Sequence, residues 1–378
     1  MKEIVKELSE YEISYIKGIA FISSESSEIE FYGIINGQMI QSNDMFEEDL
    51  VDSTIIDNFY DDLSETIRSS IKYNSDKLNI VIFDDNGEVS FNYEQPNCRT
   101  HFIRENWKKS IEEDPIFQKV EQLYKLNSKR KEYLLKNGIK DAFLYGPHYP
   151  AEYYKMNNYG IMFLNEGTYS KDGNYRKGIN FLDRKTLNSW DDINPKTKMP
   201  NYTVDTVFTI NYFIHDFIKT GNYPSAEDIK KFKNQTYSNS PEYIEKVDID
   251  KREKMDKSIY CNLRNSIVSE RIENENYLKE AYEKKENIEY MLDFIKIIRP
   301  NLIIIGSECC TDIIVKNIFP DLNGRLIFNR EPFPYNDILF VSIPHPSKLN
   351  SHEKVAEIIN KIGHAINKNL SNQQRGNV

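Results

Sequence analysis

The chain has 378 residues, a length that favours two domains or one domain with large additions. Hydrophobic residues make up 39% of it and aromatic residues 12%, which is enough for a packed core and excludes a wholly disordered chain. No apolar run approaches the ~20 residues that span a membrane, and the N-terminus lacks the apolar stretch of a signal peptide. We therefore expect a cytoplasmic protein without a membrane partner.

Charge is distributed unevenly along the chain. The net charge is −10, but residues 1–100 contain 7 Lys and Arg against 21 Asp and Glu, and the remaining residues carry a net charge of +4. An acidic surface repels phosphate, whereas a mildly basic one does not. The asymmetry predicts two domains with different partners, of which only the second suits nucleic acid.

Residues 1–104 are expected to form a small acidic α+β domain. Apolar alternation and helical spacing predict strands at 18–23 and 29–36, a helix at 53–72 capped by Ser53, and strands at 78–83 and 88–93. The last two strands flank the hairpin turn Asp-Asp-Asn-Gly. This order, followed by Arg-Glu-Asn-Trp, resembles the YezG-like immunity-protein family, and that resemblance implies a protein-interaction or immunity module. An acidic DNA mimic that covers a basic face is the alternative.

A polar segment rich in Lys and Arg follows at 105–140, and its pattern predicts a helical linker with solvated charges. From residue 141 to 370, apolar strands alternate with helices, which predicts an α/β domain with a doubly wound, mostly parallel sheet covered on both faces. Residues 371–378 are expected to be a flexible tail. The predicted strands are 160–165, 302–306 and 338–343, and the predicted helices are 205–219, 286–299 and 352–368.

Four polar motifs follow or adjoin the strands of this second domain. In chain order they read FLNEGTYS, YCNLRNS, IRPNLIIIGSECC and IPHPSKLN. Ligands of open parallel sheets bind beyond the carboxyl ends of the strands. The order and spacing of the motifs over 160–350 resemble the uracil-DNA glycosylase superfamily, and the resemblance implies a monofunctional DNA glycosylase with DNA as its partner.

The resemblance assigns a role to each polar residue. Asn165 is expected to hold the attacking water, and His345 to hydrogen-bond the base oxygen as negative charge develops there. Asn262 is expected to read the polar edge of the base. The turn after His345 supplies DNA contacts: Ser347 and Lys348 to the backbone, and Leu349 as the wedge that fills the gap left by a flipped nucleotide.

Three positions depart from the superfamily pattern. Phe163 stands where a Gly is usual, and Glu166 where a Pro is usual. We expect Glu166 to act as the general base, because the Asn165 amide cannot accept a proton. Gly167 replaces a bulky Tyr that excludes C5-substituted pyrimidines, so the site would accept a modified pyrimidine, with Tyr175 beside the base. A specialised role such as defence against phage with modified DNA bases would fit.

No cofactor or metal is expected. The four cysteines form no Cys-x-x-Cys pair, and the histidines outside the motifs have no metal-ligand spacing. His215 lies in an apolar helix and is expected to be a core residue. Simpler interpretations stay open for the motif residues: a plain turn at Pro-His-Pro-Ser, a turn residue at 165, a cap at 262 and core packing for Tyr145, Tyr149, Tyr169 and Tyr175. A catalytically inactive glycosylase-fold module that binds nucleic acid or a protein is therefore the alternative function.

Overall fold

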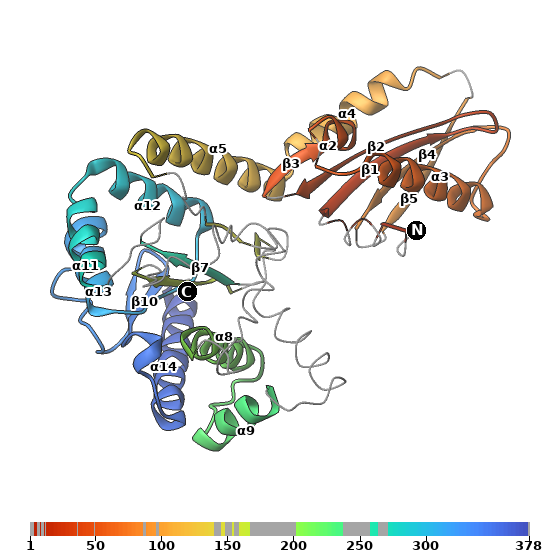
Figure 1. Cartoon of the computed structure of the whole chain (residues 1–378). Coiled ribbons are helices and arrows are strands. Elements are labelled where there is room, and N and C mark those ends of the chain that lie inside the picture. The colour runs from red at the N-terminus through yellow and green to blue at the C-terminus, as the bar shows by residue number, and fades with distance from the viewer. Residues whose placement is uncertain are drawn as a thin grey trace. The chain divides into compact units, whose positions relative to one another are not determined.

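The computed structural model describes residues 4–5, 8, 11, 13–35, 37–48, 50–85, 88–95, 98–139, 145–147, 153–154, 159–166, 202–236, 258–263 and 271–376 (Figure 1). The chain is mixed α/β and divides into two compact units, Met1–Tyr124 and Lys125–Val378. The division falls inside the segment expected to be a helical linker. Two helices occupy that segment, α4 (His101–Glu112) and α5 (Pro115–Lys136), and α5 contributes residues to both units.

Unit 1 contains a five-stranded antiparallel sheet with the order β3-β2-β1-β4-β5. Four of its strands and the helix α3 (Ser53–Ser69) lie where the hydrophobic pattern predicts them. The four-residue strand β3 and the short helix α2 (Ser42–Glu47) were not predicted, because neither is long enough to show a period. The strands are β1 (Ser14–Ile22), β2 (Ser27–Ile35), β3 (Gln38–Gln41), β4 (Leu78–Asp84) and β5 (Val89–Glu94).

Helices cover the two faces of this sheet. Helix α3 buries Phe59, Leu63 and Ile67 against alternate strand residues in one core. The predicted cap of α3 was wrong by one residue: the carboxylate of Asp52, not Ser53, accepts the Thr54 N–H at 2.9 Å. Helix α4 lies against the other face. Its contacts there are ion pairs from Arg104 and Lys108 to Glu30, the Arg104–Glu28 pair, and ring contacts between Trp107 and Tyr32.

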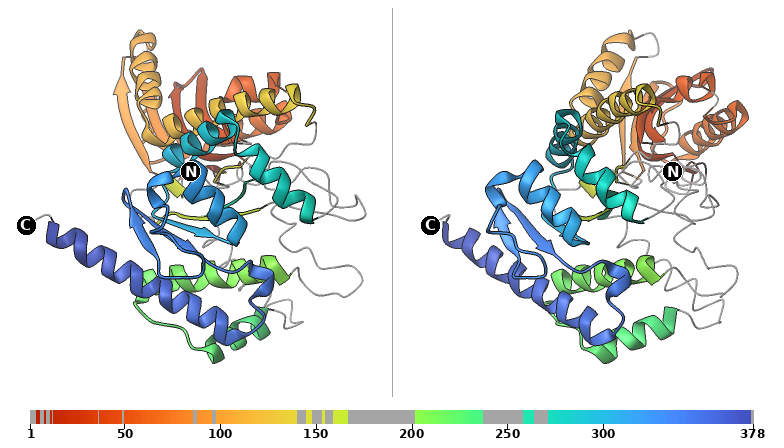
Figure 2. Two further views of the ribbon diagram at one scale, coloured as in Figure 1. Left: turned by 90° about the vertical axis from the view of Figure 1, so that its left-hand side faces the viewer. Right: turned by 60° about the vertical axis from the view of Figure 1, so that its left-hand side comes forward.

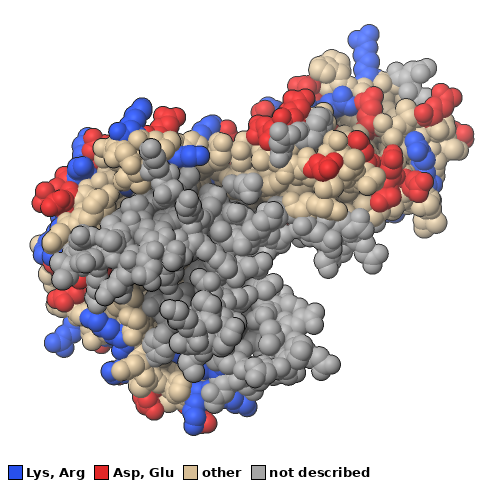
Figure 3. Space-filling view, in the orientation of Figure 1, with Lys and Arg blue, Asp and Glu red and all other residues tan. Residues whose placement is uncertain are grey.

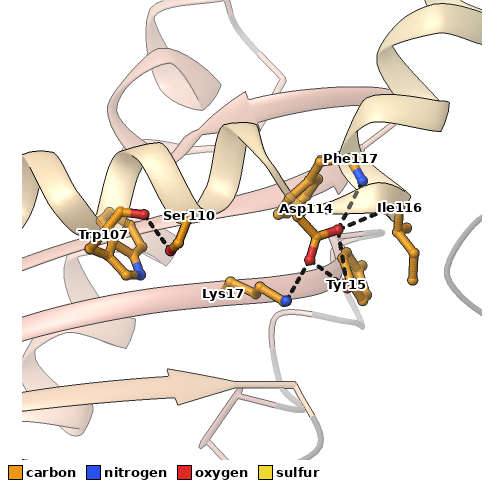
Figure 4. Close-up of polar contacts among 7 residues, drawn as sticks. All are labelled: Tyr15, Lys17, Trp107, Ser110, Asp114, Ile116 and Phe117. Atoms are coloured by element: carbon orange, nitrogen blue, oxygen red, sulfur yellow. Dashed lines mark hydrogen bonds and ion pairs between the residues drawn. The ribbon is translucent and has the colours of Figure 1, made fainter.

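A bulge in β1 brings a polar cluster to the start of α5 (Figure 4). The pairing with β2 shifts between Ser14 and Lys17, and Tyr15 adopts a positive φ of 51°. Lys17 Nζ then lies 2.6 Å from the Asp114 carboxylate, and the Tyr15 hydroxyl donates to the same group at 3.1 Å. Asp114 also accepts the N–H groups of residues 116 and 117, so it caps α5 just before the proline that begins that helix.

Unit 2 contains a five-stranded, mostly parallel sheet with the order β7-β6-β8-β10-β9. Strands β6, β7, β8 and β10 run parallel, and the edge strand β9 pairs antiparallel with β10. The four parallel strands lie at the predicted apolar runs or at the second polar motif. Their bounds, with that of β9, are β6 (Ile161–Asn165), β7 (Ser258–Asn262), β8 (Leu302–Ile305), β9 (Phe333–Tyr335) and β10 (Ile338–Ser342).

Helices lie on both faces of this sheet (Figures 1 and 2). Residues such as Phe163, Ile304 and Val341 are register neighbours and share a core with α8 (Tyr202–Thr220), α9 (Ala226–Thr236) and α14 (His352–Gly376). The opposite face presents Phe340 and Ser342 to the segment that contains α13 (Glu308–Ile313) and the π-helical turn Ile314–Ile318. Helices α11 (Arg271–Ala281) and α12 (Lys285–Ile298) lie on that side too.

Helix α14 extends beyond its predicted range. Its backbone continues to Gly376, so it includes residues 371–376 of the segment expected to be a flexible tail. Helices α8 and α12 agree with the predicted ranges, whereas α9, α11 and β9 lie in segments for which the sequence indicated nothing. Within the described ranges, no helix combines the length and apolar character needed to cross a membrane.

We expect Asp114→Asn to destabilise unit 1 by about 2 kcal/mol, because it removes a charged acceptor shared by Lys17 and the α5 cap. Burial alone would raise the pKa of Asp114, but the bonds from Lys17 and the Phe117 N–H outweigh it and lower that pKa. The carboxylate therefore stabilises the fold above its unfolded pKa of about 3.9, and this contribution is lost on acidification through the lower folded value.

Urea unfolding of the wild type and the variant from pH 7 to pH 2 measures this contribution. The wild type should lose stability as the pH falls below about 4, and the variant should lose less. Glu113→Gln is the matched control, because Glu113 is exposed and forms a surface pair with Lys109. Equal acid sensitivity in Asp114→Asn and in the wild type would contradict the assignment.

Candidate functional site

The polar motifs meet at the carboxyl edge of the unit 2 sheet. Asn165 ends β6 and Asn262 ends β7, and the two are register partners. The Leu263 N–H donates to the Asn165 carbonyl at 2.8 Å and extends this pairing by one residue. Strand β7 lies on one side of β6 in the sheet, and β8, the next strand along the chain, lies on the other side of β6. The strand order therefore reverses between β6 and β8, and ligands of open α/β sheets bind at such a point.

The Asn165 side chain lies against Gly306, the residue that follows β8. A Cβ at position 306 would stand 2.0 Å from Asn165 Oδ1 and 3.3 Å from Cδ of Pro346. Only glycine permits this approach. The β6 end, the β8 end and the loop after β10 therefore converge, which places the first, third and fourth motifs side by side.

Asn165 is 3% exposed. Burial raises the pKa of Tyr260, and the neighbouring Asn165 side chain opposes part of that rise. Among the described residues, Asn165 Oδ1 is buried and accepts no hydrogen bond. An amide oxygen can only accept, so the unsatisfied group of Asn165 is an acceptor.

Asn262 is 4% exposed. Burial raises the pKa of Tyr145, and the neighbouring Asn262 side chain opposes part of that rise. Tyr145 is fully buried, which favours the core-packing interpretation of this tyrosine.

Glu166 is 5% exposed and follows Asn165 directly. Burial is the main cause that raises the pKa of the Cys309 thiol, to about 11, and the charge of Glu166 adds to it. Glu166 therefore lies close to the start of α13, on the third motif. Its role as a general base stays a prediction.

His345 begins a short 3-10 turn, η4 (Pro346–Lys348), at the end of the sheet. Its Nδ1 accepts the Ser347 backbone N–H at 3.2 Å and lies 2.7 Å from Ser347 Oγ. A backbone N–H can only donate, so Nδ1 carries a lone pair and the Ser347 hydroxyl donates to it as well. The neutral imidazole then carries its proton on Nε2, which makes Nε2 a donor.

The turn after His345 corrects part of the expected DNA interface. Leu349 is 2% exposed and packs in the core with Val355 and Ile359, so it is not available as a wedge. It was predicted from its place in the motif, but the η4 turn directs it inward toward α14. Ser347 gives its single hydroxyl proton to His345, which leaves the exposed ammonium of Lys348 as the cationic donor of this turn.

Two expected site residues, Gly167 and Tyr175, lie outside the described residues, as do Tyr149 and Tyr169. His215 is a core residue as predicted: it is 9% exposed, and its Nε2 lies 3.1 Å from Ser258 Oγ. In the part of the chain that the structure describes, no three His, Cys, Asp or Glu side chains gather as metal ligands would.

Sequence patterns did not identify Tyr260 or Tyr145 as neighbours of the two asparagines. The chain contains 25 tyrosines, so neither stands out by type. The one available signal was position, because Tyr260 precedes Asn262 by two residues and so shares its face of the strand.

We expect Gly306→Ala to displace the Asn165 side chain and to destabilise unit 2 by about 1–3 kcal/mol, because the new methyl group would overlap Asn165 Oδ1. Thermal unfolding measures the loss. In an Asn165→Ala background the overlap is gone, so the same glycine substitution should cost much less. An equal cost in both backgrounds would show that Asn165 is not what the methyl group meets.

The sequence matches no protein-family model and no curated protein.

Proposed function

We propose that the protein is a monofunctional DNA glycosylase that hydrolyses the N-glycosidic bond of uracil or, in preference, of a modified pyrimidine. The observation that carries the proposal is the convergence of Asn165, Asn262 and His345 at one sheet edge. A sheet with the order β7-β6-β8-β10 and helices on both faces also supports a doubly wound fold of the uracil-DNA glycosylase type.

The polarity of these groups suits this reaction. Cleavage of the glycosidic bond produces a cationic sugar and an anionic base. Asn165 offers a buried acceptor that would orient a water, and His345 offers an Nε2–H donor that would stabilise charge on a base oxygen. Glu166 would take the proton of the attacking water and so complete the hydrolysis.

The buried position of Leu349 refines the substrate. Extracting a base from a duplex costs a few kcal/mol of unstacking, and a wedge residue compensates part of that cost. Without such a side chain in this turn, single-stranded DNA or weakly paired bases are the favoured substrates. A role in defence against phage with modified bases is consistent with such a preference.

A catalytically inactive binding module is the second candidate. Two observations favour it: the residue proposed for the water position, Asn165, is an amide, and Leu349 is buried. In this case the same edge would bind a base or a protein without cleaving a bond.

The acidic character of unit 1 fits a separate partner. Acidic side chains outnumber basic ones on the face of unit 1 seen in Figure 3. This surface would repel DNA and suits a basic protein partner. If unit 1 acts as a cover for DNA-binding residues, its deletion should change the DNA affinity and its salt dependence.

The decisive experiment for the leading proposal uses oligonucleotides that each carry one uracil, thymine or hydroxymethylcytosine. Alkali-labile abasic sites, first in single strands, are the expected product. His345→Ala should lower the rate constant of base release about 100- to 1,000-fold, because it removes a preorganised donor. His364→Ala is the control, because His364 lies three turns into α14 and contacts Tyr223. Absence of base release by the wild type from every substrate would exclude the enzyme and leave the binding module.

A separate prediction concerns the general base. Glu166→Gln keeps the size of the side chain and one acceptor oxygen but cannot accept the proton, so turnover should fall by about 100-fold with little change in KM. Single-turnover assays of base release across pH would measure this. Undiminished turnover would remove Glu166 from the mechanism.

A further inference from the structure

Two buried hydroxyl groups and one backbone carbonyl form a hydrogen-bonded link between β10 and α13. Ser342 ends β10, Thr311 lies in α13 and Ser307 caps that helix, and each residue is at most 5% exposed. Thr311 Oγ1 donates to the Ser307 carbonyl at 2.7 Å and lies 2.6 Å from Ser342 Oγ. Because Thr311 gives its single hydroxyl proton to that carbonyl, the Ser342 hydroxyl donates to Thr311. We call this arrangement the hydroxyl link.

Backbone hydrogen bonds hold the same edge only within the sheet. The Gly306 N–H donates to the Leu164 carbonyl, and the Ile343 N–H donates to the Ile305 carbonyl, both at 2.9 Å. Beyond Ile343 the chain reads Pro-His-Pro, and a proline has no N–H with which to continue the ladder. The hydroxyl link supplies a connection of a different kind, because it ties the last residue of β10 to a helix on the face of the sheet.

Gly306 joins the hydroxyl link to the candidate site. It directly precedes Ser307, and a Cβ on it would stand 2.0 Å from Asn165 Oδ1 and 3.3 Å from Pro346 Cδ. The loop that carries one end of the link therefore contacts both the end of β6 and the His345 turn. A displacement of this loop would change how these two segments pack against each other.

Stability alone does not require hydroxyl groups at these positions. A buried hydroxyl loses its hydration, and an apolar pair of the same shape would fill the space at little net cost. What the hydrogen bonds add is a fixed arrangement of the groups that they join. We propose that Thr311 is a positioning residue that holds the loop at Gly306 against the end of β10. Through this loop it sets the separation between Asn165 and His345, and this inference rests on the proposed function for its effect on base release.

Thr311→Val tests the proposal, because it keeps the shape of the side chain and removes the hydroxyl. The substrate is the single-stranded oligonucleotide that the wild type cleaves best among uracil, thymine and hydroxymethylcytosine. On this substrate kcat should fall about 10-fold, and KM should change by less than about twofold, since misplaced groups weaken the transition state more than the bound substrate. Thr311→Ser keeps the hydroxyl and should restore kcat to within about threefold of the wild type. An unchanged kcat in Thr311→Val, or an equal loss in Thr311→Ser, would overturn the proposal.

Thr220→Val is the matched control. Thr220 Oγ1 donates to the Asp216 carbonyl at 2.8 Å, which is the same helical pattern as in Thr311, but at the end of α8. Its loss should leave kcat and KM unchanged. A decrease in kcat as large as that of Thr311→Val would show that the effect is not specific to the hydroxyl link.

The imidazole signals of His345 supply a readout that does not depend on activity. The chain contains six histidines, so histidine-selective isotope labelling gives few signals, and the His345 signal is the one that His345→Ala removes. Thr311→Val should shift or broaden this signal, whereas Thr220→Val should leave it unchanged. If the wild type releases no base, the proposed function fails, and the His345 signal still decides the positioning role. An unchanged signal in Thr311→Val would contradict it.

A second substitution separates positioning from stability. Thr311→Val leaves the buried Ser342 hydroxyl without its acceptor, and adding Ser342→Ala removes that hydroxyl. The double variant should therefore unfold at a higher temperature than Thr311→Val alone, yet retain the loss of kcat and the altered His345 signal. If Thr311→Val does not fold, Ser342→Ala alone breaks the link from the other side and should produce the same two changes. Wild-type values of both in a folded double variant, or in Ser342→Ala, would refute the proposal.

Discussion

The close approach of the Asn165 amide to the backbone of Gly306 is the contact on which the site depends. Any Cβ at residue 306 would occupy the place of Asn165 Oδ1, so the end of β6 and the end of β8 come together only because this residue is glycine. Pro346 packs beside the same point and brings the His345 turn with it. One missing side chain therefore lets three separate segments share an edge.

The sequence was most informative where a single physical rule governs a segment. Strand β8 is a run of Leu and Ile that is buried on both faces, and α14 repeats isoleucine at helical spacing. The pattern of apolar residues was therefore enough to predict both elements. The parallel order of the strands followed from the alternation with helices. Asn165 and Asn262 could be predicted as strand-end residues, but their direct pairing is a matter of register, which no local pattern encodes.

Tertiary packing decided the features that the sequence did not reveal. Leu349 was predicted to be a wedge from its place in the motif, but its side chain packs in the core with apolar residues of α14. Burial of an apolar side chain is favourable, and a local motif does not encode it. The bulge in β1 is a similar case. A positive φ at Tyr15 is unfavourable for a bulky residue, and the gain is that Tyr15 and Lys17 both reach Asp114. Local propensity would have predicted an unbroken strand there.

Neighbouring groups give the site its polarity. The Ser347 N–H and hydroxyl both donate to Nδ1 of His345, so the neutral imidazole carries its proton on Nε2, and the Asn165 oxygen lies against Gly306. Under the proposed function, the Asn165 oxygen would orient a water and the His345 Nε2–H would stabilise charge on the leaving base at one sheet edge. Both groups are fixed before any substrate arrives, so little reorganisation would accompany the reaction. The motif residues alone do not define this polarity, since an asparagine or a neutral histidine can present either a donor or an acceptor; their neighbours select which one faces the substrate.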